Sequence, residues 1–521
     1  MPPQETDVLV VGAGPTGLAL ALVLRQAGLR VLVVERSTSR DRRTRAITLH
    51  APTLEFLDAL GLLTEVREKG LALERISFHT HQGSYHGPLT GLDSTVDGYL
   101  NLPQPVYEEL LEEAARDSGV LFRHGTTYLG HSGGDRSPDH SPDESPDEPL
   151  TVRLNGAGGP SLVRCRYLIG CDGAGSQVRA RLGSSLEGRH APASYLLVEG
   201  TPLLPATEPE TGIYVGRAGM VTLAPLPSGQ VRVAGPADMM LALDKDAQVT
   251  ADQVATLVDA LGFGDRLRLK QVARVAQYTV QERIASRMAE GRVALAGDAA
   301  HLNAPAGGQG LNLGIGDVLD LAWRIVYAIR HDTAADMAGY ESERREAAAE
   351  AIAAADVLPL VQRMRTAGGT ADEETLRQAL TRHAPRWSQL YPHHPAPDAP
   401  DLPGAYRLEK GTRVPTAVRE TTGPVDLLPA GTDATLSTLL VAHPSFLARA
   451  RDLAGGHTEL LGCPPVGMLD TVPLDEHHPR VRAMWPQGAA ALLVRPDRRV
   501  AAVLTADALA GGARRLALST T

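Results

Sequence analysis

Short apolar runs separated by glycines open the chain. Residues 8–11 and 31–34, each with the sequence VLVV, have the composition of buried strands, and residues 16–25 between them carry a helical pattern of apolar positions. A strand, a glycine-rich turn, a helix and a second strand in this order predict a βαβ unit of the dinucleotide-binding kind.

The period of the pattern changes further along the chain. Residues 195–204 and 212–235 lie between Gly/Pro turn signals and predict a separate antiparallel sheet. Residues 311–330 and 338–357 predict helices, and residues 491–504 predict a strand, a turn and a strand. The pattern therefore indicates an α/β core, an added β-sheet and a smaller C-terminal α/β region.

Two segments interrupt this pattern. Residues 133–149 repeat Ser-Pro-Asp and offer almost nothing that could be buried, which predicts a disordered acidic loop. Residues 391–404 are rich in Pro, His and Asp and predict a linker. The residues that follow the linker are enough for one further domain.

Composition narrows the classes of partner. With 521 residues and 43% apolar content, the chain can form two or three domains. A net charge of −10 disfavours nucleic acid, because phosphate binding needs a basic face. The three cysteines form neither a CxxC pair nor a metal-ligand spacing, so we expect no metal. The first residues are not those of a secretion signal or a membrane span, so we expect a cytoplasmic protein.

The first turn carries residues suited to a dinucleotide. Gly12 permits the turn, Gly14 lets backbone approach a pyrophosphate, and Gly17 lets the helix pack closely on the strand. Glu35 ends the second strand, where its carboxylate can accept hydrogen bonds from ribose hydroxyls. This group of predicted cofactor-binding residues comprises Gly12, Gly14, Pro15, Thr16, Gly17, Glu35 and Arg36. It does not distinguish FAD from NAD, since both contain ADP.

A second motif is suited to a flavin. Residues 291–325 comprise a strand that ends at Asp298, a loop of small residues, and a helix. Such an aspartate can bind ribityl hydroxyls, and the amides at the helix N-terminus can face the pyrimidine edge of the flavin. The segment resembles the GD motif of class A, para-hydroxybenzoate-hydroxylase-like, FAD-dependent monooxygenases. The resemblance adds Asp298, Pro305, Gly308, Gly310, Leu311 and Asn312 to the predicted cofactor-binding residues, with Pro305 and Gly308 nearest the reacting part of the flavin.

Residues 166–183 resemble the DG motif of the same family, in which an Asp-Gly pair after an apolar strand is followed by Ser and Arg. By itself an Asp-Gly pair is a common turn. The resemblance implies that this motif serves flavin and nicotinamide binding through Asp172, Gly173, Ser176 and Arg179.

Two more residues match positions at which the family contacts its cofactor. They are Arg45, for which a surface ion pair is the alternative, and Gln104. His301 lies within the flavin-binding motif, and we expect it to hydrogen-bond to the backbone rather than to take part in catalysis.

Among members of this family, the aromatic polyketide hydroxylases are closest in character. The resemblance implies a Rossmann-like FAD-binding domain with an inserted antiparallel substrate sheet and a C-terminal thioredoxin-like domain. The predicted ranges are 1–75, 100–185 and 276–390 for the FAD-binding domain, 76–99 and 186–275 for the substrate sheet, and 405–521 for the thioredoxin-like domain. Without a CxxC motif, that last domain is not expected to carry out thiol chemistry.

The resemblance also implies the reaction. NADPH, or NADH, would reduce FAD, and a flavin C4a-hydroperoxide formed with O2 would hydroxylate a polycyclic aromatic ring of the polyketide type. The protein would exclude water and position the ring, so we expect no catalytic triad. A Baeyer–Villiger oxygenase or epoxidase and a flavin reductase that incorporates no oxygen remain alternatives, as do a monomer and a homodimer.

We expect the substrate to lie between the flavin and the predicted sheet. Candidate contacts are Tyr214, Arg217 and Met220, and the alternative is that they are ordinary strand residues.

Overall fold

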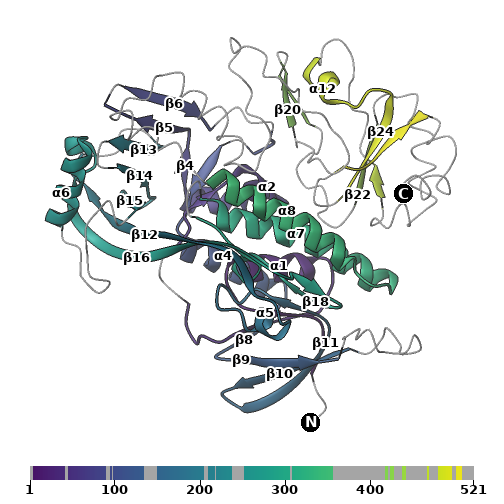
Figure 1. Cartoon of the computed structure of the whole chain (residues 1–521). Helices are drawn as coiled ribbons and strands as arrows, with labels where there is room; N and C mark the ends of the chain where they lie inside the picture. The colour runs from purple at the N-terminus through teal and green to yellow at the C-terminus, as the bar shows by residue number, and fades with distance from the viewer. Residues whose placement is uncertain are drawn as a thin grey trace.

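The structure, a computed structural model, describes residues 4–40, 45–81, 83–89, 94–96, 98–133, 149–204, 209–216, 219–236, 251–304, 308–355, 417–420, 423–426, 437–441, 466–468, 479–495 and 500–506. The described chain forms two large sheets, a small three-stranded sheet and a C-terminal region (Figure 1). Residues 134–148 of the expected acidic loop and the expected linker at 391–404 lie outside the described residues.

The first large sheet contains the predicted βαβ unit. β1 (Gln4–Val11) pairs in parallel with β2 (Val31–Glu35) and β11 (Gly159–Gly170), and α1 (Pro15–Gln26) connects β1 to β2. The strand order is β17-β18-β11-β1-β2-β8, and β10 pairs with β11 and β9. The other strands are β8 (Leu121–His124), β9 (Thr127–Ser132), β10 (Leu150–Gly156), β17 (Ala289–Glu290) and β18 (Val293–Leu295).

Helices pack against this sheet. α1 contacts α4 (Gln104–Asp117) and α7 (Gln309–His331), and α7 contacts α8 (Met337–Ala355). Apolar residues of α1, α4 and α7 share one buried core with β1 and β2. α7 and α8 lie where helices were predicted. The shorter helices are α2 (Ala51–Ala59), α3 (Leu63–Lys69) and α5 (Gln177–Arg181).

The second large sheet has the order β19-β16-β12-β15-β14-β13-β5-β6. Two long strands, β12 (Leu186–Pro202) and β16 (Leu269–Ala285), connect it to the first sheet (Figure 1). The domain boundary expected at residue 275 falls inside β16. Its pairing is antiparallel except between β13 and β5, which are parallel. Its other elements are β5 (Arg75–His79), β6 (Ser84–Pro88), β13 (Glu210–Gly216), β14 (Gly219–Pro225), β15 (Val231–Pro236), α6 (Ala251–Leu261) and β19 (His301–Leu302).

A small three-stranded sheet lies next to the second large sheet. It comprises β3 (Thr48–Leu49), β7 (Tyr99–Asn101) and β4 (Leu71–Leu73), with β7 in the middle. Asn101 of β7 links this sheet to β14, because its Nδ2 donates a hydrogen bond to the Pro225 carbonyl at 2.8 Å, while its Oδ1 accepts one from Thr48 Oγ1 of β3 at 2.8 Å.

The C-terminal region contains a four-stranded sheet of order β23-β22-β24-β25. β24 and β25 form the predicted strand–turn–strand, and Arg495, just after β24, forms an ion pair with Glu343 of α8 at 2.5 Å. The elements are β20 (Ala417–Glu420), β21 (Gly423–Asp426), β22 (Ser437–Val441), β23 (Val466–Met468), α12 (Pro479–Met484), β24 (Ala489–Val494) and β25 (Val500–Thr505). In the described residues, no helix combines the length and the hydropathy needed to span a membrane.

Candidate functional site

One cavity of about 1340 Å³ extends from the first turn of the chain to the second large sheet. The N-terminal ends of α1 and α7 line one part of it, which we call the motif half. Strands β5, β12, β13, β14, β15 and β16 line the other part, which we call the sheet half. A single cavity thus connects the predicted dinucleotide-binding turn with the predicted substrate sheet.

The turn after β1 requires glycine at two positions. Gly12 has φ +107°, and a Cβ there would lie 2.3 Å from the Cys171 carbonyl oxygen. A Cβ on Gly17 would lie 2.1 Å from the Gly12 carbonyl oxygen, so the start of α1 packs directly on the turn. A Cβ on Gly14, in contrast, would meet no atom within 4 Å. The lining of the cavity includes Gly14, so its backbone is open to a ligand.

Glu35 stabilises this turn from the end of β2. Its Oε2 accepts a hydrogen bond from the Ala13 amide at 3.0 Å, and its Oε1 accepts one from the Ser37 amide at 2.9 Å. Both oxygens keep acceptor capacity for ribose hydroxyls. Pro15, Thr16 and Arg36 also line the cavity, next to Glu35 and Gly14.

The predicted DG motif forms a tight turn between β11 and α5. Asp172 accepts hydrogen bonds from the Ser176 hydroxyl and, at 2.6 Å, from the Gln177 amide, and Ser176 caps α5. Arg179 donates to the Ala299 carbonyl at 2.9 Å and so ties this turn to the Asp298 loop. Asp172 and Gly173 line the cavity, whereas Ser176 and Arg179 are absent from its lining and hold the turn in shape.

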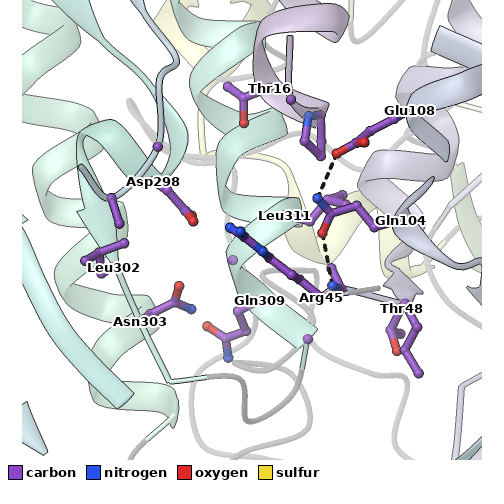
Figure 2. Close-up of a pocket in the computed structure, with 18 of the residues that line it drawn as sticks. Thr16, Arg45, Thr48, Gln104, Glu108, Asp298, Leu302, Asn303, Gln309 and Leu311 are labelled. Atoms are coloured by element: carbon purple, nitrogen blue, oxygen red, sulfur yellow. Dashed lines mark hydrogen bonds between the residues drawn. The ribbon is translucent and has the colours of Figure 1, made fainter. Parts of the chain in front are cut away.

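Asp298 follows β18 in a short 3₁₀ turn, Gly297–Ala299, as the motif predicted. Its carboxylate points into the cavity, and the Arg45 side chain points toward it from the opposite side (Figure 2). Desolvation by the surrounding protein raises the pKa of Asp298, and the charges of His301 and Arg45 oppose that rise. A carboxylate held here can accept hydrogen bonds from a polyhydroxylated ligand.

The sequence analysis did not predict a buried hydrogen-bond network that lies next to the Asp298 turn. Asp317 of α7 is fully buried and accepts hydrogen bonds from the Gly297 amide at 2.8 Å, His301 Nε2 at 2.7 Å and Arg344 Nε at 2.7 Å. Burial alone would raise the pKa of Asp317, but the charges and hydrogen bonds of these partners outweigh it and lower the pKa. We expected His301 to hydrogen-bond to the backbone, and this expectation is wrong, because its Nε2 forms a hydrogen bond with the Asp317 carboxylate. The sequence signal is weak, because Asp317 is one polar residue within the helical pattern of α7, and only its burial and contacts show that it faces inward.

Gln104, the first residue of α4, supports the segment that carries Arg45. Gln104 Oε1 accepts a hydrogen bond from the Ala46 amide at 3.1 Å, and its Nε2 donates to Glu108 at 2.8 Å (Figure 2). Gln104 therefore fixes the backbone that carries Arg45. Both side chains line the cavity.

The N-terminus of α7 faces the cavity. Gly308 caps the helix with φ +67°, and Gly308, Gly310 and Leu311 line the cavity. Gln309, which was not singled out in the sequence, is fully buried and lines the cavity. Neither of its side-chain polar atoms has a hydrogen-bond partner within the part of the chain that the structure describes (Figure 2). Pro305 lies outside the described residues.

The Asn312 side chain connects three elements of the fold. Its Oδ1 accepts hydrogen bonds from the His50 amide at 2.9 Å and the Thr53 hydroxyl at 2.7 Å, and its Nδ2 donates to the Thr48 and Gly308 carbonyls at 3.0 and 2.7 Å. It is buried and is not part of the cavity lining. The side chain thus fastens β3 and α2 to α7, and a contact between Asn312 and the cofactor stays a prediction.

The sheet half shows which strand residues face the cavity. Along β13, Thr211, Ile213 and Val215 line it, whereas Tyr214 points to the other face. There the Tyr214 ring stacks on His79 with centroids 4.4 Å apart. The proposed contact at Tyr214 is therefore corrected, because successive strand residues alternate between faces.

Met220 and Arg217 are the other two predicted substrate contacts. Met220 of β14 lines the cavity. Arg217 lies outside the described residues. Around Met220, the sheet half is lined mainly by apolar and small residues, among them Leu197, Thr222, Ala234 and Ala276. Such a surface suits a flat aromatic molecule.

The motif half fits FAD by its own chemistry. It offers an open backbone at Gly14 for a pyrophosphate, carboxylates at Glu35 and Asp298 for hydroxyls, and the N-terminus of α7 for negative charge on the flavin. The buried amide of Gln309, with no partner among the described residues, is a polar group of the kind that a bound ligand satisfies.

Comparison with known proteins agrees with these features. A family model described as "FAD binding domain" matches residues 5–355. The chain is similar to a rifampicin monooxygenase of Streptomyces venezuelae, with 35% identity over 331 residues, 61% of this chain and 63% of that protein. It is also similar to the 12-dehydrotetracycline 5-monooxygenase/anhydrotetracycline 6-monooxygenase of Streptomyces rimosus, with 34% identity over 360 residues, 66% of this chain and 67% of that protein. The match thus spans less than two thirds of the first relative.

A solved structure covers nearly the whole chain. It is the ternary complex of aklavinone-11 hydroxylase with FAD and aklavinone, with a TM-score of 0.70, 25% sequence identity and coverage of 99% of both chains.

Proposed function

Because the chain belongs to the FAD-binding-domain family of flavoprotein aromatic monooxygenases, we propose that it hydroxylates a polycyclic aromatic substrate of the polyketide type. The proposed reaction consumes NADPH or NADH and O2. The relatives named for rifampicin and anhydrotetracycline, and the aklavinone complex, support a substrate of this class.

The observation that carries the proposal is the continuity of the cavity. The residues that fit FAD and the apolar rows of the second sheet line the same space. When bound, FAD supplies electron transfer from the nicotinamide and the activation of oxygen. The protein contributes binding and orientation, and it excludes water around the reacting ring.

Individual residues divide these tasks. Glu35, Gly14 and Asp172 surround the space for the ADP portion, and Asp298 is available to the ribityl hydroxyls. Gln104 and the Asp317 network hold the loops that carry Arg45 and Asp298. The apolar face of β13, β14 and β16 would receive the aromatic ring.

The C-terminal region is proposed to be a thioredoxin-like domain. The mixed pairing in its four-stranded sheet, with β22 parallel to β23 and antiparallel to β24, supports this assignment. Its contact with α8 through Arg495 supports a structural role beside the FAD-binding part.

The proposal is tested by oxygen transfer and by FAD retention. FAD-loaded protein is supplied with NADPH, polycyclic phenols and isotopically heavy O2, and the products are analysed by mass spectrometry. One heavy oxygen atom in a ring hydroxyl supports the proposal. A heavy atom within a new lactone would instead show Baeyer–Villiger chemistry, and reduced product without it would show a reductase.

A variant pair tests the cofactor site separately. We expect Asp298→Ala to weaken FAD binding roughly 100-fold, because a charged hydrogen-bond acceptor is lost. Asp117→Ala, a change at an exposed carboxylate on α4, should retain FAD in full after gel filtration. Stoichiometric flavin in Asp298→Ala would overturn the assigned role of Asp298.

A further inference from the structure

Three charged residues lie side by side on the second sheet. The register pairs Glu199 of β12 with Arg232 of β15 on one side and with Arg274 of β16 on the other. Because cross-strand partners point to the same face of a sheet, the carboxylate lies between two guanidinium groups. We call this set the charge row.

The two arginines of the charge row are not equivalent. Arg232 is buried and donates to Glu199 Oε1 from Nε at 3.0 Å and from one terminal nitrogen at 2.5 Å, while its other terminal nitrogen donates to the Arg45 carbonyl at 2.8 Å. Arg232 therefore neutralises Glu199 and supports the Arg45 loop.

Arg274 has much weaker contacts. Its guanidinium lies 3.8 Å from Glu199 Oε2, and within the described chain this ion pair is its only polar contact. A quarter of its side chain remains exposed, and it lines the cavity. One carboxylate thus faces two cations, which leaves one positive charge directed at the cavity.

The surroundings make this charge unusual. On the described strands of the second sheet, Arg274 is the one charged residue that lines the cavity. The row beside it, on the same face, consists of Ile213, Thr222, Ala234, Leu197 and Ala276. A cation next to an apolar surface gains most from a ligand that brings a negative charge, because little water is left to solvate it once the cavity is filled.

We propose that Arg274 binds an anionic oxygen of the aromatic ligand, an ionised phenol or enol, and thereby sets the orientation of the ring system on the sheet. The inference rests on the proposed function and adds to it a chemical requirement on the substrate. A guanidinium is suited to this task because it stays charged and donates several hydrogen bonds in a plane.

The test compares two probes in the FAD-loaded protein. They are 1,2-dihydroxyanthraquinone and its 2-methyl ether, and their affinities are measured from changes in flavin absorbance over a series of pH values. The native protein should prefer the phenol about ten-fold once the phenol is ionised, as expected for one charged hydrogen bond. Arg274→Met should reduce the preference to about two-fold or less at every pH, and Arg274→Lys should keep part of it.

Lys270→Gln is the matched control, since Lys270 lies on the same strand and is exposed. It should leave the preference unchanged. An unchanged preference in Arg274→Met, or no preference in the native protein, overturns the proposal. If oxygen is still incorporated in either case, the proposed function stands. If the preference depends on Arg274 but no product contains heavy oxygen, the anion site stands and the proposed function fails.

Discussion

The two halves of the cavity are built differently. In the motif half, buried polar groups and glycines with special geometry hold each loop, as Gly12 and Asp317 show. In the sheet half, alternate residues of regular strands present mainly apolar side chains, such as Ile213 and Leu197. A substitution in the motif half breaks a network, whereas one in the sheet half changes a surface. The motif half is therefore suited to one fixed cofactor, and the sheet half can change its ligand while the fold is kept.

The largest effect should come from Asp317→Asn. Removing the charge leaves Arg344 buried beside a neutral group and weakens the link from α7 to His301 and Gly297. We expect a loss of about 3–5 kcal/mol in the free energy of unfolding, as is typical when one partner of a buried ion pair is removed. Urea denaturation measures it, with Asp117→Asn as an exposed control that should change stability by less than about 0.5 kcal/mol.

This effect should depend on pH in a defined direction. The pKa of Asp317 is lowered in the folded protein, so its stabilising contribution is complete above the ordinary pKa of aspartate and is lost as the pH falls through the lower folded value. The difference in Tm between the native protein and Asp317→Asn should therefore shrink in acid. A constant difference from neutral pH to pH 3 would contradict the assigned charge state.

A smaller effect is expected from the first turn. Gly12→Ala places a Cβ 2.3 Å from the Cys171 carbonyl and forces alanine to adopt φ +107°, so the apoprotein should lose roughly 2 kcal/mol of stability and with it most of its FAD affinity. A Cβ at Gly14→Ala meets no protein atom, so this substitution should leave the stability of the apoprotein unchanged and weaken only the binding of FAD. Thermal unfolding without FAD and a titration with FAD separate the two. Normal FAD affinity in Gly14→Ala would show that the pyrophosphate does not approach this backbone.

The same contrast explains what could be predicted from sequence. The βαβ unit, α7 and the position of Glu35 and Asp298 at the cavity were predictable, because short-range geometry and chemistry restrict the residue types that can stand there. Asn312 and Asp317 were harder to interpret, since a polar residue within a motif can bind the cofactor or fasten the loops around it. Only the contacts of its side chain distinguish these roles.

The sheet half was less predictable for a different reason. A strand pattern gives the period of alternation, but a shift of one residue exchanges its two faces. Tyr214 was chosen on the wrong face for this reason. Arg274 carries no local signal, because its role depends on Glu199 and Arg232 from two other strands.

The smallest expected effect is on ligand affinity, and it tests which side chains of β13 face the cavity. Ile213 and Tyr214 are neighbours on β13, and only Ile213 lines the cavity. Ile213→Ala removes apolar contact from the cavity surface, so it should lower the binding affinity for an aromatic ligand about five-fold while FAD content stays the same. Tyr214→Phe keeps the ring that stacks on His79 and should change the affinity for the same ligand by less than about two-fold. Ligand titration of the FAD-loaded variants compares them. A larger loss in Tyr214→Phe than in Ile213→Ala would mean that the ligand contacts the opposite face of the sheet, and the assignment of Ile213 to the ligand-binding face of β13 would then be wrong.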